Sequence, residues 1–506
     1  MLLEMIIAAA TEVLEGAPED VTAGTLFREA SKGCVVWRGH GSDLYADIKY
    51  GGQTRSVLLP STKFEAWLRV LFHALSNGNI PTEACIQRVV NMFMSQAAFT
   101  TRRQTVYNRV GFYDNALYID MANEPQTYIK VTVAGWEIVK ESPIKFVRGD
   151  YVGELPVPKR TEKCLKDLIA PFVAPKAQEK LPLIVGYLLG LVMPEGPYPV
   201  LVVTGQHGAA KSTMVKLLRA IVDPHTLDMR APFKDERDFV AAVKNGYCLA
   251  FDNVSYIPNW LSDSLCALAT GDRALGGRTL YKDHDESAFW AVRPILCNGI
   301  PEFVRRPDLV DRIIRLDFPR LTSYKPTRAF WNEFKEAHPE VLGALLDVAV
   351  QGLARLEGTE APVNIRMSGF AQWVIACETA AGFQGGEFMG QLMANKHEAN
   401  ETVLEFSSTG LAIILMLQDL GRFYGTYREL KNEILKYAYD TKKIPDNNAA
   451  LVGEIKTLVP ALTAMDIMIK FHGRTNERGV RRGQSVIELE RIDEKVQPEQ
   501  QNNTGS

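Results

Sequence analysis

The residues best suited to chemistry in this sequence stand in one short loop. Gly205, Gly208, Lys211 and Ser212 occur in the stretch 199–218, which reads PVLVVTGQHGAAKSTMVKLL. Small residues allow several backbone N–H groups to converge on a triphosphate at the start of a helix. We expect Lys211 to reach the β- and γ-phosphates and the Ser212 hydroxyl to complete a Mg²⁺ shell. The loop therefore predicts a site for ATP and Mg²⁺.

Two elements must position this loop. Residues 200–203 are consecutively apolar, as in a buried parallel strand, and apolar side chains recur at helical spacing over 214–218. The motif departs from G-x-x-x-x-G-K-[ST] because Ala210 replaces the second glycine, which Gly208 partly offsets. The alternative is a glycine-rich turn that merely joins a strand to a helix. The predicted nucleotide-binding residues are Gly205, Gln206, His207, Gly208, Ala209, Ala210, Lys211, Ser212 and Thr213.

A second apolar segment, GYCLAFDNVS at 246–255, reads as a buried strand that ends in Asp252. In a P-loop enzyme this acid would hold the Mg²⁺ through water, although any strand can end in aspartate. Asn253 follows, where many ATPases carry a glutamate that activates the attacking water. An amide can orient water but cannot take its proton. The general base therefore stays open, with Glu236 and Asp263 as weak candidates.

A third strand is predicted over RPILCNG, 293–299, and it ends in the polar Asn298. The preceding GGRTLYKDHDESAFWAV reads as a hairpin that carries Arg278, Lys282 and His284. Directly after the strand comes RRPDLVDRIIRLDFP, in which an arginine falls within a helix-to-strand transition.

Together, GQHGAAKS, LAFDN, ILCNG and RPDLVDRIIRL resemble the Walker A, Walker B, sensor 1 and arginine-finger elements of AAA+ ATPases. The hairpin before sensor 1 resembles that of superfamily 3 viral helicases and minichromosome-maintenance helicases. The chain looks most like the replicative helicase-type ATPases of phages and mobile elements, strongly over about 160–330. NIRMSGFAQW more weakly resembles the start of a lid helix.

The resemblance implies a hexameric ring with ATP between subunits. Arg312 would reach the γ-phosphate of a neighbouring subunit's ATP, and Arg366 would match a sensor 2 arginine. Asn298 would be the sensor 1 residue, and the hairpin at Lys282 would contact DNA and move with hydrolysis. Either arginine could instead serve in a surface salt bridge.

Composition limits the class of protein. The chain has 506 residues, 46% of them hydrophobic, and a formal net charge of −3, so any DNA-binding surface must be a local patch. Its seven cysteines form no CxxC pair, which favours reduced thiols over a zinc or disulfide framework. The longest apolar run, near 181–193, is too short to span a bilayer, and the N-terminus is acidic. We expect a cytoplasmic protein of a bacterial cell or phage-infected host, without membrane contact.

The predicted fold class is an α/β P-loop AAA+ core with an α+β N-terminal domain, a helical lid and a C-terminal winged helix. The predicted boundaries are 1–153 for the N-terminal domain, 154–160 for a linker, 161–330 for the core, 331–404 for the lid, 405–492 for the winged helix and 493–506 for a disordered tail. In 405–492, predicted helices precede two strands around a basic turn. The candidate phosphate contacts there are Lys470, Arg474, Arg478, Arg481 and Arg482. A solubilising hairpin is the alternative.

Three functions remain open at this point. The first is a DNA helicase or translocase, acting in replication on single-stranded or duplex DNA. The second is an AAA+ switch that binds an origin or loads another helicase, and the third is a protein-remodelling ATPase. The basic hairpin favours DNA over remodelling. In the N-terminal domain, Arg102, Arg103 and Arg109 among Tyr107 and Tyr113 could also bind nucleic acid, although a solvated strand face is the stronger interpretation.

Overall fold

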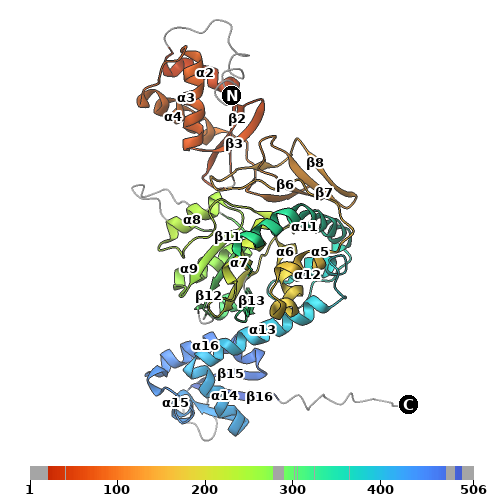
Figure 1. Ribbon diagram of the computed structural model, residues 1–506. Coiled ribbons are helices and arrows are strands. Elements are labelled where there is room, and N and C mark those ends of the chain that lie inside the picture. The colour runs from red at the N-terminus through yellow and green to blue at the C-terminus, as the bar shows by residue number, and fades with distance from the viewer. Residues whose placement is uncertain are drawn as a thin grey trace, which may run out of the picture.

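The computed structural model describes residues 21–39, 41–276, 290–300, 303–304, 306–323, 325–363, 365–474 and 485–492. The predicted tail at 493–506 lies outside these residues. Figure 1 shows the order of the described parts in space, with helices α2–α4 (within 23–99) at one end, the sheet of strands β10–β13 (within 200–318) in the middle and helices α14–α16 (within 408–464) at the other end.

The first part combines helices with a small antiparallel sheet. Its elements are α2 (Ala23–Lys32), β1 (Cys34–Arg38), β2 (Leu44–Tyr50), β3 (Gln53–Leu59), α3 (Thr62–Leu75) and α4 (Glu83–Phe99). Gly51 and Gly52 form the turn between β2 and β3: both residues have positive φ, and Tyr50 pairs with Gln53 across them. Leu26, Phe64 and their buried neighbours form a core separate from that of the rest of the chain.

A second antiparallel sheet follows and lies against the central part. Its strands are β5 (Val110–Tyr113), β6 (Ala116–Asp120), β7 (Tyr128–Thr132) and β8 (Gly135–Val139), next to the short parallel pair β4 (Val106–Tyr107) and β9 (Lys145–Phe146). Buried residues of this sheet, such as Leu117 and Ile129, belong to the same hydrophobic core as the β10–β13 sheet. The N-terminal third of the chain therefore contains two packing units.

The proline-containing stretch 154–160 forms no helix or strand, yet it is closely packed. The Leu155 N–H donates to the Met121 carbonyl at 2.9 Å, and the Lys159 N–H donates to the Pro339 carbonyl at 2.8 Å. A Cβ on Gly343 would lie 1.8 Å from the Lys159 carbonyl oxygen, so glycine is required for this approach. These contacts hold the stretch against a long helix, α11 (Thr327–Leu356).

The central sheet is parallel and has the order β11-β12-β10-β13. Its strands are β10 (Val200–Gly205), β11 (Leu249–Val254), β12 (Ile295–Gly299) and β13 (Ile313–Phe318). Its connecting helices include α7 (Lys211–Val222), α8 (Glu236–Asn245) and α9 (Asn259–Thr270). The apolar run at 200–203 is 2% exposed or less at every residue, as expected for a strand covered on both faces. The predicted α/β P-loop core is confirmed.

Further helices surround this sheet. They are α5 (Leu165–Ile169), α6 (Leu181–Gly190), α10 (Pro307–Val310), α11, α12 (Ser368–Glu378) and α13 (Glu387–Phe406). Every residue of α6 is buried, so the longest apolar run of the sequence is a core helix. No single helix in the described residues is long and apolar enough to cross a bilayer; α13 joined to α14 (Ser408–Leu420) meets that test only as a pair bent by 103°.

The C-terminal part consists of helices and an antiparallel sheet with the order β14-β16-β15. Its elements are α14, β14 (Arg422–Thr426), α15 (Tyr427–Ile434), α16 (Asn448–Ala464), β15 (Ile467–Arg474) and β16 (Ser485–Arg491). The sequence predicted the last two strands but missed β14. That strand pairs only with β16, more than 50 residues away, and a capping box at Thr426 starts α15 directly after it. Local patterns therefore indicated a helix start and no strand.

Candidate nucleotide-binding site

The loop between β10 and α7 depends on two unusual backbone conformations. Gly205 has φ +134°, and a Cβ there would lie 2.1 Å from the Phe318 carbonyl oxygen of the neighbouring strand β13. Ala210 occupies the left-handed region, with φ 58° and ψ 25°, immediately before α7. The substitution of alanine for the motif's second glycine has therefore kept a glycine-like conformation, at a cost of about 1–2 kcal/mol.

Three predicted polar residues meet at the carboxyl edge of the sheet. The Ser212 hydroxyl donates to Asp252 Oδ1 at 2.9 Å. The Asn298 amide Nδ2 lies 3.3 Å from the same serine oxygen, and Asn298 is 2% exposed. Because β10 and β11 both pair with β12, the ends of these parallel strands must lie side by side. The sheet thus brings together residues that lie up to 86 positions apart in the sequence.

Lys211 lies within the loop itself. Its ammonium donates to the carbonyl oxygens of Gly205 and Gln206 at 2.8 Å and 2.9 Å. This position and the backbone N–H groups at the start of α7 suit a phosphate group. The adjacent Ser212 and Asp252 oxygens suit Mg²⁺, which is usually held by one or two protein oxygens together with phosphates and water. The described residues contain no cluster of three or more acidic, histidine or cysteine side chains that could hold a metal by itself.

A cavity of 590 Å³ adjoins the loop. Gly208, Ala209, Ala210, Thr213 and Met214 form one side of it. The rest of the lining includes an apolar wall of Phe172, Val173 and Phe330, with the two phenylalanine rings 5.7 Å apart and nearly perpendicular, and also the basic residues Lys176, Arg320 and Lys325. Its volume and its largely apolar walls beside a phosphate-binding loop fit a nucleoside. Sequence reasoning missed this wall because Phe172 and Phe330 belong to no motif. In the sequence, Phe172 precedes all four strands of the central sheet and Phe330 follows them.

Within the described residues, the Asn253 side chain makes no hydrogen bond to the polar cluster of Ser212, Asp252 and Asn298. It has φ 53° at a point where the pairing of β11 with β12 shifts register, and its side chain is exposed. Its backbone N–H donates to Asn298 Oδ1 at 3.0 Å. The link between the strand ends therefore runs through the Asn253 backbone and the Asn298 side chain.

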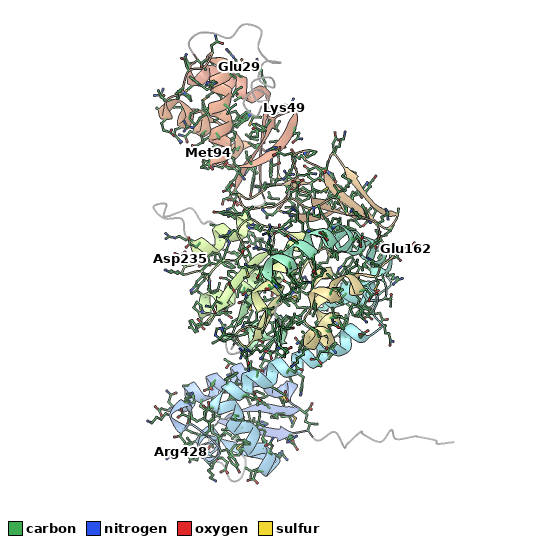
Figure 2. All side chains as sticks on the ribbon, in the orientation of Figure 1. Glu29, Lys49, Met94, Glu162, Asp235 and Arg428 are labelled. Carbon is green, nitrogen blue, oxygen red and sulfur yellow. The ribbon has the colours of Figure 1, made fainter. Side chains whose placement is uncertain are left out.

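Neither weak candidate for the general base gains support from its position. Asp263 on α9 forms an ion pair with Arg306 at 2.6 Å. Glu236 is the first residue of α8, and Asp235 just before it lies at the outer margin of the central part in Figure 2. The Asp235 side chain caps α8 by accepting from the Arg237 and Asp238 N–H groups.

Arg312 and Arg366, the two arginines assigned by resemblance, lie close to each other. Both contact Asp272 rather than the cluster of Ser212, Asp252 and Asn298. Arg312 is 6% exposed; its Nη1 donates to the Asp308 carbonyl at 2.6 Å and its Nη2 lies 3.5 Å from Asp272 Oδ2. Arg366, just before α12, lies 3.6 Å from the same carboxylate oxygen. A hydrogen bond from Thr270, followed by that from Arg312, lowers the pKa of Asp272. One carboxylate thus holds both arginines within the subunit.

Most predicted DNA contacts cannot be placed. Arg278, Lys282 and His284 lie outside the described residues, and so do Arg478, Arg481 and Arg482. Arg474 ends β15, where its backbone pairs with Ser485 of β16. Lys470 lies on the same strand opposite Glu488.

Arg109, which the sequence suggested as a nucleic-acid contact or a solvated strand residue, is neither. It is fully buried, and its Nε donates to Asp223 Oδ1 at 2.9 Å. It also donates to the carbonyls of Asp120 and Gly153 at 2.8 Å and 2.7 Å. Its side chain therefore joins the β5–β8 sheet to the end of α7. Arg102 and Arg103 are exposed.

Comparison with known proteins places this site in context. Residues 167–391 match the model of a family described as actinomycete integrative conjugative element replication protein. No curated protein sequence matches the chain. The solved structure titled "SCCmec type IV Cch - active helicase" is 13% identical with a TM-score of 0.43, over 91% of this chain and 93% of that one. The C-terminal region of NrS-1 is 12% identical with a TM-score of 0.38, over 92% and 99%.

Cdc6p from Pyrobaculum aerophilum is also similar, at 12% identity and a TM-score of 0.17, over 67% of this chain and 94% of that one. The range that matches the replication-protein family contains the whole loop at 205–213 together with Asp252, Asn298, Arg312 and Arg366. In the part that carries its candidate nucleotide site, the chain is therefore similar to the replication proteins of mobile elements, as its motifs predicted.

Proposed function

We propose that this chain is an ATP-hydrolysing helicase or translocase that acts on DNA in the replication of a mobile genetic element. The observation that carries the proposal is the contact of Ser212 with Asp252 and Asn298 directly beside the phosphate-binding loop. In P-loop enzymes the loop serine and a strand-end acid together hold Mg²⁺ for phosphoryl transfer, and here a strand-end amide contacts the same serine. The family match over 167–391 supports the role in replication.

The side chains have separate roles in this proposal. The loop N–H groups and Lys211 bind the phosphates, and Ser212 and Asp252 hold Mg²⁺. When bound, Mg²⁺-ATP supplies the phosphoanhydride whose hydrolysis drives movement. Asn298 contacts both Ser212 and the Asn253 backbone. A displacement of Ser212 at the phosphate site would therefore be transmitted to the ends of both β11 and β12. The cavity lined by Phe172 and Phe330 receives the nucleoside.

Ring assembly and DNA contact belong to the same proposal. Arg312 would act on the ATP of a neighbouring subunit in a hexamer, and it must then exchange Asp272 for that ATP. The segment 276–292, for which the sequence predicts a hairpin, would contact DNA through Lys282. The helices α14, α15 and α16 with the β14–β16 sheet support a winged-helix interpretation of 405–492, in which the basic turn contacts DNA phosphates.

A second function has one specific observation in its favour. The residue after Asp252 is an amide, and Asp263, one of the two candidate bases, is engaged by Arg306. Slow hydrolysis would suit an ATP-controlled switch that binds an origin or loads another helicase. In such a switch, ATP binding changes DNA binding or assembly, and turnover only resets it.

The two functions differ in how hydrolysis responds to DNA. The ATPase rate should be measured with and without single-stranded DNA on a sample of measured mass, together with strand separation of a forked duplex. A motor gives DNA-stimulated hydrolysis and strand separation, and a switch gives ATP-dependent DNA binding with unstimulated hydrolysis. Lys211→Ala is the control, and normal turnover by that variant would remove the basis of both proposals.

A further inference from the structure

A second cavity lies at the end of the central sheet that is opposite the nucleotide site. Its volume is 370 Å³. Tyr198, Tyr247 and Arg293, which line it, precede β10, β11 and β12 respectively. Tyr107 of β4 and Phe112 of β5 form the facing wall. The cavity is therefore bounded by the central sheet on one side and by the accessory β-structure on the other.

Aromatic surface is exposed at this cavity. Trp290, which lines it, is 63% exposed, and no other tryptophan in the described residues is as open to solvent. Tyr107 is partly buried and has its hydroxyl 3.3 Å from the Phe112 carbonyl oxygen. An exposed indole beside further aromatic rings offers faces on which a planar ring can stack.

Arg293 is the positively charged side chain of the cavity lining, and it is incompletely paired. Arg293 Nη2 donates to Asn108 Oδ1 at 2.6 Å, while its Nε is buried and has no hydrogen-bond partner among the described residues. No carboxylate of the described residues forms an ion pair with it, and burial lowers the pKa of its guanidinium. A guanidinium with no direct carboxylate partner, whose Nε lacks a hydrogen bond, favours an anionic or acceptor-rich ligand. The exposed Glu195 also lines the cavity and opposes such a ligand from the solvent side.

Planar stacking surfaces beside an unpaired cation match the chemistry of a nucleotide. We propose that this cavity binds one unstacked nucleotide of single-stranded DNA, with the base against Trp290 and the phosphate attracted by Arg293. The site rests on the proposed DNA function and adds contacts at Trp290 and Arg293 to those proposed for Lys282 and for the C-terminal basic turn. Trp290 belongs to the same sequence segment, 276–292, as Arg278, Lys282 and His284.

The test measures binding of a fluorescently labelled oligo(dT) to the full chain with a non-hydrolysable ATP analogue. Trp290→Ala should weaken binding about tenfold, because one stacking contact is lost. Trp290→Phe keeps an aromatic face and should stay within about threefold of the parent chain. Tyr113→Ala is the matched control: it removes an exposed aromatic residue adjacent to Phe112, outside the cavity, and should leave affinity unchanged.

Two further measurements identify the ligand's charge and its place. Glu195→Gln should strengthen DNA binding by about twofold or more and make it more sensitive to added salt, because a repulsion that salt screens is removed, whereas a basic peptide as the natural ligand would bind this variant less well. DNA should quench the indole fluorescence of the parent chain more than that of Trp290→Phe. If the parent chain binds DNA and Trp290→Ala binds it equally well, the cavity proposal is wrong and the proposed motor function stands. If the parent chain binds no DNA, both are wrong.

Discussion

The two ends of the central parallel sheet differ in how far their polar side chains are exposed to solvent. At the carboxyl end, Lys211, Ser212 and Asp252 are partly exposed; the Ser212 hydroxyl donates to Asp252, and Lys211 donates to the loop carbonyls of Gly205 and Gln206. At the amino end, Arg109 and Asp223 form an ion pair whose side chains are 0% and 1% exposed. In a parallel sheet every following helix starts at the carboxyl end, so N–H groups that can bind phosphate gather there. At the amino end the accessory β-structure packs over the sheet; it encloses the Arg109–Asp223 pair, here called the closed end, and leaves the separate cavity at Arg293.

One helix connects the two ends. The P-loop lysine and serine begin α7, and Asp223 directly follows its last residue. Asp223 Oδ2 accepts the Cys248 N–H at 3.0 Å, one residue before the strand that leads to Asp252. The nucleotide site at the carboxyl end, here called the ligand-accepting end, and the enclosed Arg109–Asp223 pair are therefore connected by the same two elements, α7 and β11. Variants at each end can show whether they act independently.

The largest expected effect is on the rate of hydrolysis. If Arg312 acts in trans, Arg312→Ala should retain ATP binding but lose about 10³–10⁵ in turnover. ATPase assays and nucleotide binding by calorimetry measure the two. Arg306→Ala, which removes a more exposed arginine paired with Asp263, should stay near the parent rate.

Mixed rings locate the action of Arg312. Combined with Lys211→Ala subunits, the Arg312→Ala protein should regain activity at interfaces that pair an intact loop with an intact arginine. Rings shown by mass to be mixed, yet without any rescue, would contradict an action in trans.

The closed end should respond through stability. Arg109→Ala leaves Asp223 buried without its partner, which should cost about 3–5 kcal/mol of unfolding free energy. Chemical denaturation measures this, with exposed Arg103→Ala as the control. The double variant Arg109→Met with Asp223→Leu should recover part of the loss. A loss equal to that of Arg103→Ala would show that the ion pair does not hold the accessory sheet.

At the ligand-accepting end, the same kind of substitution should leave stability nearly unchanged. Lys211→Ala and Asp252→Ala should each reduce turnover at least 10²–10³-fold, because each removes a group that stabilises charge in phosphoryl transfer. Their melting temperatures should stay close to that of the parent chain. A strongly lowered melting temperature would mean that this end, too, is held together by its polar contacts.

Acid should weaken the region around the end of α7. Burial lowers the pKa of His338 to about 4, and this histidine of α11 contacts the Ile221 carbonyl at 3.0 Å. The unfolded chain takes up a proton near pH 6.5 while the folded chain does not, so the stability present above that pH falls as pH drops from 6.5 towards 4, by up to about 3 kcal/mol. Denaturation at pH 7.5 and pH 5 measures the loss. His338→Gln should flatten the dependence, and exposed His73→Gln should not.

The smallest effect concerns the loop conformation. Ala210→Gly removes the cost of a left-handed alanine and should stabilise the fold by about 1 kcal/mol or less, because the glycine gains chain entropy when unfolded. Ala209→Gly is the control and should not stabilise. Equal responses would show that the φ of Ala210 carries no strain.

Local sequence patterns were sufficient to predict the nucleotide site at the ligand-accepting end of the sheet. A strand, a small-residue loop and a helix are consecutive in the chain, and Asp252 and Asn298 each end an apolar strand, so their types and positions predict one shared edge. The hairpin turn at 51–52 and the helices α3 and α4 were predictable for the same reason, because turn residues and apolar spacing are local signals.

Only the tertiary structure decided the remaining features. Phe172 meets Phe330, Arg109 meets Asp223, and Arg312 meets Arg366 at Asp272 across long separations in sequence. No local pattern distinguishes a buried arginine from a solvated one, because burial depends on which element packs over it. The strand β14 likewise exists because β16 returns to pair with it. Chain order thus determined the chemistry of the loop, while long-range packing determined which charges are exposed to a ligand and which are enclosed.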